Sequence, residues 1–358
     1  MNVISKNNYL KLFEEKKKSF SGAFKKDFSI EYYPSPFRAY RHRAEFSLIN
    51  KKDDLSFAMT VNGRKEKINS FPIASQKIQD LMEPLRKSIQ DDAVIKEKLF
   101  QVEFQSSRSE EGMVSLIYHK NLDVDWQEKA REISNKLKIS IIGRSKNQKI
   151  IIGNNFVTET YNCLNKDFSM RLYEQCFSQT NPFVCDDMLT WVATNISRNS
   201  KDILELHCGL GTFTIPLSHL YRKVLATENS RPSIQALNDN IFLNNRKNIY
   251  SGRLSGKETL EALQRKRNFR RLQDIDLDEF EIKTIFLDPP REGLDVFTIQ
   301  NLINVENIIY ISCGFESFKR DLKILQKTHR ILDLALFDQF PYTDHIESGA
   351  ILKRIAPI

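Results

Sequence analysis

Residues 202–213 read DILELHCGLGTF, an apolar strand-like run that leads directly into a turn with two glycines. Gly209 and Gly211 have no Cβ, so the backbone there turns sharply and allows a ligand to approach closely. The next apolar run ends in Glu228, where a carboxylate accepts hydrogen bonds from ribose hydroxyls in nucleoside-binding sheets. The third glycine of the dinucleotide fingerprint is missing, because Phe213-Thr214 follows. The run therefore predicts a site for a nucleoside without a pyrophosphate, and an ordinary strand–helix turn is the alternative.

Apolar strand-like runs recur through the second half of the chain. Apolar runs at 202–208, 223–228, 283–288 and 307–313 alternate with segments of helical length. This β-α-β-α pattern is typical of a parallel sheet covered by helices on both faces, and such sheets bind ligands at the carboxyl ends of their strands. The sequence therefore predicts a Rossmann-like α/β domain over residues 183–358.

The first half of the chain follows a different pattern. From Arg41 onward, apolar and polar residues alternate as in a half-buried strand. Further strands are predicted at 55–61, 99–105, 113–119 and 139–144, and helices near 74–90 and 125–138. Residues 1–20 are typical of an amphipathic helix with Leu10 and Phe13 facing inward. We therefore expect an α+β domain over residues 1–182.

Composition and charge exclude several classes of protein. The chain has 358 residues, of which 41% are hydrophobic, too many for a disordered chain. Lys and Arg number 54 against 46 Asp and Glu, so the net charge of +8 weakly favours a polyanionic partner. No apolar run approaches the length of a membrane span, and the amino terminus lacks the apolar core of a secretory signal. We expect a soluble, cytoplasmic protein of two domains.

The five scattered cysteines include no C-x-x-C pair, so neither zinc nor a cysteine-ligated iron–sulfur cluster is expected, and no metal site is predicted. Cys313 differs from the others because it ends a predicted strand beside the nucleoside site. A helix is predicted to follow, and the positive end of a helix dipole lowers the pKa of a thiol. Cys313 is therefore a candidate nucleophile, and the alternative is a small core residue.

Acidic residues at two other strand ends indicate the charge of the ligand. Glu205 would repel phosphates but suit a sulfonium that also carries an amino group, which is the charge pattern of S-adenosylmethionine. Asp288 is followed by two prolines and Arg291. Amine methyltransferases have an aromatic residue where Arg291 stands, so methylation of an amine is not favoured. A purely structural turn is the alternative for this segment.

A thiolate, a methyl sulfonium and a base together suit methylation of a pyrimidine carbon. Uracil C5 attacks a methyl group only after a thiolate has added to C6. A base must then remove the C5 proton so that the thiol can leave. Asp344 and Glu347 flank His345 near the carboxyl end, and we expect Glu347 to be the base and Cys313 the nucleophile. A surface turn with solvated charges is the alternative for the segment around His345.

The sequence resembles the bacterial tRNA (uracil-5-)-methyltransferases over nearly its full length from Arg41. The stretches that carry the resemblance are Ser70-Phe-Pro, Lys98-Leu-Phe100-Gln, Ser115-Leu-Ile-Tyr-His119-Lys, Leu225-Ala-Thr-Glu228, Phe286-Leu-Asp-Pro-Pro-Arg291, Tyr310-Ile-Ser-Cys313 and Ala335-Leu-Phe-Asp-Gln-Phe-Pro-Tyr342. The resemblance implies a carboxyl-terminal class I methyltransferase domain, an amino-terminal RNA-binding domain and S-adenosylmethionine as cofactor. It implies methyl transfer to C5 of the T-loop uridine (uridine 54) of tRNA.

Carried over position by position, the resemblance implies Cys313 as nucleophile and Glu347 as base. With Gly209 of the glycine turn, the residues implied to line the cofactor pocket are Gln179, His207, Thr212, Glu228 and Asp288. The implied partners are the T-arm of tRNA and also tmRNA, and we expect a monomer that binds neither a membrane nor a metal. The chain departs from the family pattern at His207 (usually Tyr), Leu210 and Thr212 (Asn), Gly314-Phe315 (Asn-Pro), Thr180 (Pro) and Ser348 (Cys).

A base within a folded loop must be flipped out before a thiolate reaches C6, which requires phosphate contacts and a stacking side chain. The residues we expect to bind RNA are Arg41, Arg43, Phe100, His119, Arg270 and Arg271. The last two belong to a basic run at 265–271 that includes Phe269, for which a solvated helix end is the alternative.

Two other functions stay open at this point. A ribosomal-RNA uracil-C5 methyltransferase would share the chemistry, but many of that group have an amino-terminal barrel or a four-cysteine cluster, and the first cysteine here is Cys163. An RNA-binding folding helper would need neither Cys313 nor Glu347.

Overall fold

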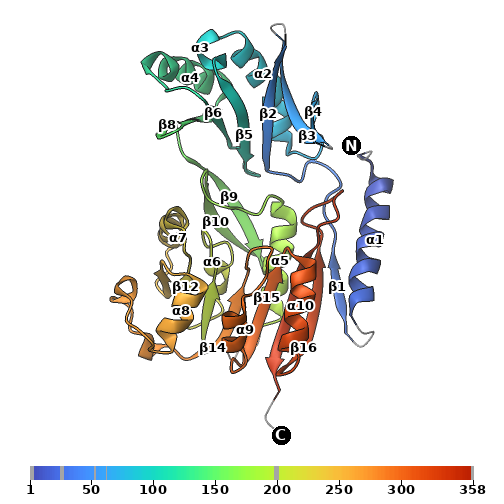
Figure 1. Cartoon of the computed structure of the whole chain (residues 1–358), viewed down its shortest axis with the longest axis vertical. Helices are drawn as coiled ribbons and strands as arrows, with labels where there is room; N and C mark the ends of the chain where they lie inside the picture. Colours follow the sequence, from blue (N-terminus) through green and yellow to red (C-terminus); the bar gives the residue numbers. More distant parts are fainter. Residues whose placement is uncertain (1–3, 25–27, 52–53, 62, 197–200, 356–358) are drawn as a thin grey trace. The chain divides into compact units, whose positions relative to one another are not determined.

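The computed structural model describes residues 4–24, 28–51, 54–61, 63–196 and 201–355. The chain folds into two compact units. The larger unit comprises Met1–Ser35, Tyr161–Met170 and Gln175–Ile358, and the smaller one comprises Pro36–Thr160 and Arg171–Glu174. Figure 1 shows the helices and strands of both.

The smaller unit is a seven-stranded sheet with helices on one face. Its strands, in the order β4-β3-β2-β5-β6-β7-β8, are β2 (Arg43–Lys51), β3 (Asp54–Val61), β4 (Arg64–Lys67), β5 (Leu99–Ser106), β6 (Gly112–Tyr118), β7 (Ser140–Ser145) and β8 (Gln148–Ile152). Its helices are α2 (Gln76–Gln90), α3 (Ala93–Lys96) and α4 (Val124–Leu137). Only β6 and β7 pair in parallel among the described neighbours. The predicted α+β class and its strand positions are confirmed.

One hydrophobic core holds this sheet to its helices. Phe46 and Phe104 from neighbouring strands pack in the same buried cluster as Leu85 of α2 and Trp126 of α4. Trp126 lies so close to the sheet that a Cβ at Gly143 would fall 2.3 Å from its ring. Glycine at this position is therefore required by the close approach of the helix.

The larger unit is an eight-stranded, mostly parallel sheet. Its strands, in the order β1-β16-β17-β15-β14-β11-β12-β13, are β1 (Ile30–Tyr33), β11 (Asp202–Leu206), β12 (Lys223–Thr227), β13 (Ile249–Gly252), β14 (Ile282–Leu287), β15 (Asn307–Ser312), β16 (His329–Phe337) and β17 (Glu347–Arg354). β17 is antiparallel to both of its neighbours. The predicted Rossmann-like sheet is confirmed, and its strand order reverses between β11 and β14.

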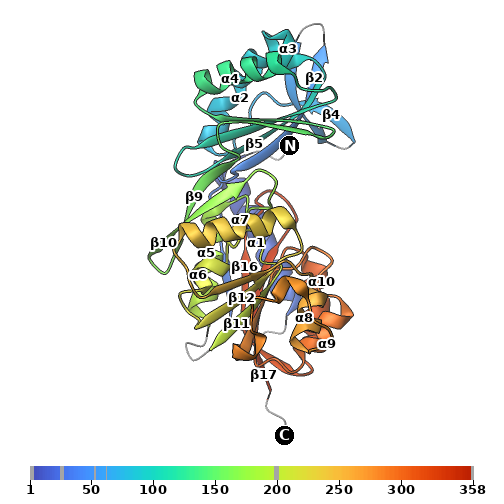
Figure 2. The same cartoon turned by 90° about the vertical axis from the view of Figure 1, so that its left-hand side faces the viewer.

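Helices lie on both sides of this sheet. Figure 2 shows α5 and α6 on one side and α8, α9 and α10 on the other. The helices of the unit are α1 (Lys6–Ala23), α5 (Pro182–Thr194), α6 (Thr214–Leu217), α7 (Arg231–Leu243), α8 (Gly256–Leu263), α9 (Val296–Leu302) and α10 (Phe315–Leu325), with 3-10 turns at Arg270–Leu272 and Leu277–Glu279. The arrangement follows from right-handed crossovers that run outward in both directions from β11.

The compact units divide the chain differently from the predicted single boundary between residues 182 and 183. β1 pairs in parallel with β16, which joins the first 35 residues to the larger unit. A two-stranded sheet of β9 (Phe156–Cys163) and β10 (Lys166–Tyr173) has residues in both units. An edge strand of four residues has too little alternation to reveal a partner more than 300 positions away in the sequence.

The predicted amino-terminal helix is present as α1, but it buries a different set of residues. Tyr9, Phe13, Lys16 and Phe20 form its buried face, at spacings that place them along one side of a helix. Phe13 was correctly expected to face inward, whereas Leu10 is 46% exposed. Lys16 was not expected to be buried, because a lysine is ordinarily found at the surface.

Candidate active site

The carboxyl edge of the larger sheet brings together the residues that were expected to carry the chemistry. β11, β14 and β15 are parallel neighbours, so Glu205 in β11, Asp288 after β14 and Cys313 after β15 all lie at this edge. β17 enters the same edge in the opposite direction and begins with Glu347. Ser312 of β15 is opposite Ser348 of β17, and the same register continued by one residue places Cys313 opposite Glu347.

The glycine turn after β11 has the conformation that the sequence predicted. Gly209 and Gly211 have φ angles of 57° and 96°, in the left-handed region that favours glycine. A Cβ at Gly211 would lie 2.5 Å from Leu237 of α7, whereas a Cβ at Gly209 would meet no described atom within 4 Å. Gly211 therefore lets helix and strand pack closely, and Gly209 faces open space.

Glu228, at the end of β12, lies against this turn. Its carboxylate accepts hydrogen bonds from the backbone N–H of Gly209 at 3.2 Å and of Ser230 at 2.8 Å. These two bonds fix the carboxylate beside the open side of the turn, where it was expected to meet ribose hydroxyls. Thr212 is half-buried nearby in sequence, while His207 is exposed with a φ of 61°.

A pair of buried amides forms a further part of the site. Gln179 is buried, and its Oε1 accepts a 2.7 Å hydrogen bond from Nε2 of Gln339. Oε1 of Gln339 is itself buried and has no hydrogen-bond partner among the described residues. Sequence reasoning named Gln179 and missed Gln339, although Gln339 stands within the Ala335–Tyr342 stretch that carried the family resemblance.

Three carboxyl groups at this edge have raised pKa values. Burial raises the pKa of Glu205 to about 8, with a contribution from the charge of Asp288, and burial raises the pKa of Asp288 to about 7. Burial raises the pKa of Glu347 well above its usual range, Asp288 raises it further, and the cation of Arg291 opposes both. One cation among three such carboxyls makes the site suited to a positively charged ligand, whose binding would favour their ionised forms.

Cys313 does not have the lowered pKa that was expected from the following helix. Burial raises the pKa of its thiol to about 11, and the charges of Glu347 and Asp288 add to this shift. Arg291 lowers it, both by its charge and by a hydrogen bond to the thiol. The expectation was wrong because desolvation and two carboxylates outweigh the dipole of α10. Sequence reasoning also missed Arg291 as the cation that faces both Cys313 and Glu347.

Four of the expected RNA-binding residues belong to the smaller unit. The ring of Phe100 stacks on that of His119, with centroids 3.9 Å apart and planes at 8°. Arg41 Nε donates to the carbonyl of Arg43 at 2.8 Å, and Arg43 lies 3.7 Å from a carboxylate oxygen of Glu103. The aromatic pair is partly exposed, so it offers a stacking surface. The two arginines lie towards the other end of β5, where Arg43 is opposite Gln105.

The other two, Arg270 and Arg271, are exposed in the 3-10 turn of the larger unit. Arg271 Nη1 donates to the carbonyl of Arg253 at 2.7 Å and lies 3.9 Å from Glu258. Arg265 and Arg267 of the same basic run pair with Asp278, Glu258 and Glu261. Much of the charge of this run is therefore balanced by neighbouring carboxylates.

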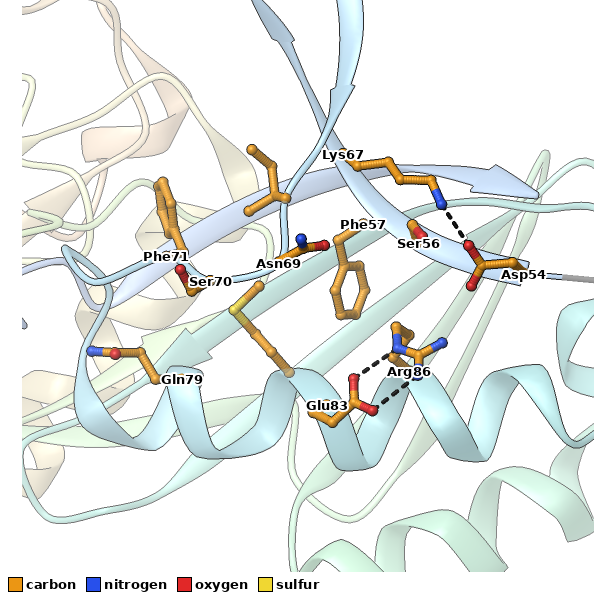
Figure 3. A pocket seen from close by; sticks show the side chains of 12 residues that line it. Asp54, Ser56, Phe57, Lys67, Asn69, Ser70, Phe71, Gln79, Glu83 and Arg86 are labelled. Carbon is orange, nitrogen blue, oxygen red and sulfur yellow. Dashed lines mark hydrogen bonds and ion pairs between the residues drawn. The ribbon is translucent and has the colours of Figure 1, made fainter. Parts of the chain in front are cut away.

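A cavity of about 450 Å³ lies in the smaller unit between β3, β4 and α2 (Figure 3). Phe57, Phe71 and Met82 form its apolar part, and the ion pairs Lys67–Asp54 and Arg86–Glu83 stand at its side. None of the expected site residues lines it. Because its charges are paired, it has neither the acidic character of the first site nor a basic surface for phosphates.

No described helix is long and apolar enough to cross a membrane. No group of three or more His, Cys, Asp or Glu side chains suited to hold a metal ion occurs in the described part of the chain.

Comparisons with known proteins show the family of this chain. The family model described as tRNA (Uracil-5-)-methyltransferase matches residues 8–355. A tRNA/tmRNA (uracil-C(5))-methyltransferase of Aliarcobacter butzleri (strain RM4018) is 45% identical over 350 residues, which cover 96% of this chain and 92% of the relative. One of Acinetobacter baumannii (strain ACICU) is 42% identical over 335 residues, which cover 91% of this chain and 93% of the relative.

A solved structure resembles the whole chain. It is the tRNA (uracil-54, C5)-methyltransferase of Pyrococcus abyssi in complex with S-adenosyl-L-homocysteine, with a TM-score of 0.74 and 22% sequence identity. The match covers 97% of this chain and 83% of that chain. At this level of identity the likeness establishes the fold.

Proposed function

The chain belongs to the tRNA (uracil-5-)-methyltransferase family, and from this premise we propose that it methylates C5 of the T-loop uridine, uridine 54, in tRNA. The names of the curated relatives support tRNA and tmRNA as the RNA substrates. The name of the similar Pyrococcus abyssi enzyme supports position 54. We further propose that the protein acts as a monomer in the cytoplasm.

S-adenosylmethionine, when bound, supplies the methyl group as a sulfonium. The residues at the carboxyl edge fit such a ligand, because one oxygen of the buried Glu205 and one of the buried Gln339 have no hydrogen-bond partner among the described residues. Both atoms can accept hydrogen bonds, as an ammonium requires, and the ionised carboxylate of Glu205 also attracts a sulfonium by its charge. Gln179, Thr212, Glu228, Asp288 and the backbone at His207 and Gly209 would hold the rest of the molecule.

In the first chemical step, the Sγ of Cys313 adds to C6 of the uracil. The new C6–S bond moves the electron pair of the C5–C6 double bond into the ring as an enolate, which makes C5 nucleophilic. C5 would then form a bond to the methyl carbon, while the methyl–sulfur bond of the donor breaks and leaves its electron pair on a neutral thioether sulfur. Arg291 assists this step because its charge and its hydrogen bond stabilise the thiolate of Cys313.

In the second step, a carboxylate oxygen of Glu347 accepts the proton from C5. The C5–H electron pair reforms the C5–C6 double bond, the C6–S bond breaks, and the thiolate of Cys313 leaves. The observation that carries the proposal is the pairing of β15 with β17. Ser312 is opposite Ser348 in this pair of strands, and the same register continued by one residue would bring Cys313 opposite Glu347. Nucleophile and base are then on adjacent backbones at the one edge of the sheet that binds ligands.

Two substitutions test the assignment with a tRNA transcript and labelled S-adenosylmethionine. Cys313→Ala removes the nucleophile, so methyl transfer should be lost while binding of tRNA is kept. Glu347→Gln keeps the nucleophile but removes the proton acceptor, so a covalent protein–RNA adduct should accumulate as a retarded band on a denaturing gel. Methyl transfer by Cys313→Ala would contradict the proposal. A ribosomal-RNA transcript assayed in parallel distinguishes the ribosomal alternative.

A further inference from the structure

Lys16 is a buried lysine on the amino-terminal helix, far in sequence from the proposed catalytic residues. Its side chain is 7% exposed, and its Nζ donates to Oδ1 of Asp338 at 2.7 Å and to the carbonyl of Phe340 at 2.9 Å. Asp338 is 1% exposed. One ammonium therefore holds two points at the start of the loop that joins β16 to β17.

This loop connects two parts of the proposed site, the buried amide pair of Gln179 and Gln339 and the proposed base Glu347. Phe337, the residue before Asp338, is opposite Glu347 in the β16–β17 ladder, so Asp338 and Glu347 stand at the two ends of the loop. Gln339 follows Asp338 directly and bonds to Gln179. A shift of Asp338 would thus move both Gln339, which belongs to the buried amide pair proposed to bind the methyl donor, and the proposed base Glu347.

Other side chains of α1 contact the same loop and the start of α10. The ring of Tyr9 lies 6.1 Å from that of Tyr342, in the middle of the loop, and Tyr342 donates from its hydroxyl to the carbonyl of Ser5 at 3.4 Å. The ring of Phe20 stacks on Phe315 at 5.4 Å, two residues after Cys313. The helix is therefore packed against the segments that hold the nucleophile and the base.

Stability alone is a poor reason for a buried lysine on this face. A buried ion pair loses so much hydration energy that a well-packed apolar pair is often as stable or more stable. The neighbouring positions on the same face are already filled by aromatic side chains. What the Lys16–Asp338 pair adds is a fixed geometry, because the ammonium bonds only to acceptors that are held at hydrogen-bond distance.

We propose that Lys16 is a positioning residue for the methyl transfer, which fixes Asp338 and the Phe340 carbonyl so that the loop holds Gln339 in the donor pocket and Glu347 opposite Cys313. This inference rests on the proposed function, because it assigns Lys16 to the placement of the proposed base and donor pocket.

The test uses the double variant Lys16→Met/Asp338→Asn in the full chain, which removes both charges and leaves no unpaired ion in the interior. We expect a modestly lower melting temperature, because the side chain at position 338 and the Phe340 carbonyl lose the donor that Lys16 supplied, and a chain that still folds. We expect a kcat for tRNA methylation that is lower by roughly ten- to a hundredfold, since displacement of a catalytic group by about 1 Å has effects of this size. Because the base is displaced and the nucleophile is not, covalent adduct should accumulate as with Glu347→Gln. A merely structural loss of folded protein would not produce that adduct.

Lys17→Met is the matched control. Lys17 is the next residue on α1, and it pairs at the surface with Glu14 at 2.8 Å, so its loss should change neither kcat nor the adduct. If the double variant fails to fold, Asp338→Glu decides the question, because it keeps the charge and the pairing but lengthens the link between Lys16 and the loop by one methylene. Normal kcat in a folded double variant, or in Asp338→Glu, would overturn the inference while the proposed function stands. An unmodified chain that does not methylate tRNA would instead overturn the proposed function.

Discussion

Cys313 combines a nucleophile's position with a thiol that resists ionisation. With a pKa of about 11, its thiolate fraction near pH 8 is on the order of one in a thousand, because each pH unit below the pKa lowers that fraction about tenfold. The cause is burial together with the carboxyls of Glu347 and Asp288. A positive ligand beside these groups would stabilise the thiolate. Bound S-adenosylmethionine would therefore increase the thiolate fraction of Cys313, the proposed nucleophile.

The pH profile of alkylation tests this coupling at the level of one residue. Since a raised pKa lowers the thiolate fraction at neutral pH, iodoacetamide should modify the ligand-free protein slowly at pH 7–8 and progressively faster up to about pH 11. S-adenosylmethionine should move the profile to lower pH. S-adenosylhomocysteine, which has a neutral sulfur, should move it less and is the matched control. The other four cysteines are buried, and Cys313→Ala gives their background. A ligand-free profile centred at or below the ordinary thiol pKa would contradict the reasoning.

The residue scale shows what a sequence can and cannot predict about this site. Cys313 and Asp288 were found because each ends an apolar run, and parallel strands end at one edge of a sheet. The direction of the thiol pKa was wrong because it depends on Glu347 and on burial, which only the folded sheet determines. Arg291 and Gln339 stood within recognised motifs, but their partners are set by long-range packing.

At the scale of elements, the turn into α10 is as tightly constrained as the glycine turn after β11. Gly314 caps α10, and a Cβ on it would fall 2.3 Å from the carbonyl oxygen of Arg291 and 2.5 Å from Oγ of Ser317. Ser317 itself donates to that carbonyl at 2.7 Å. The start of α10 is thereby tied to the turn that carries Arg291. The departure from the family's usual Asn at 314 fits this close approach.

Gly314→Asn, which restores the family's usual residue, should therefore impair this chain. The added Cβ forces the Arg291 turn away from Cys313, at a cost of about 1–3 kcal/mol in the free energy of unfolding. We expect a lower melting temperature and a reduced kcat, with binding of tRNA kept. Gly22→Ala is the control, because a Cβ at Gly22 meets no described atom within 4 Å. Normal activity and stability in Gly314→Asn would show that the turn relaxes without cost.

Prediction of elements succeeded where a segment is long or periodic. The helices near 74–90 and 125–138 and the central strands of both sheets were found from apolar periodicity, because each buries one face or lies wholly inside. The outer strands β4, β8, β13 and β16 were not predicted. The division of the chain into the two compact units was not predicted, because β1 is short and pairs with β16 near the other end of the chain. Burial of Lys16 in place of Leu10 likewise depends on Asp338, which no local pattern of α1 reveals.

At the scale of the whole molecule, the total of 54 Lys and Arg overstates the number of cations available to RNA. Arg43 lies near Glu103, and Arg267 and Arg271 lie near Glu258. Phosphates must compete with these carboxylates for the same guanidinium groups. Each expected RNA-binding arginine therefore needs its own test, because its presence in a basic run is not enough.

The salt dependence of tRNA affinity provides that test. Each phosphate neutralised by the protein contributes a slope of about −0.9 to the plot of log affinity against log salt concentration. Binding of labelled tRNA, followed by fluorescence anisotropy across a range of NaCl concentrations, should therefore weaken steeply with salt. Arg43→Gln and Arg271→Gln should each reduce the slope by about one if the arginine leaves its carboxylate for a phosphate, whereas Lys17→Met should leave it unchanged. A slope that neither arginine variant alters would mean that Glu103 and Glu258 keep these side chains, and that other cations hold the RNA.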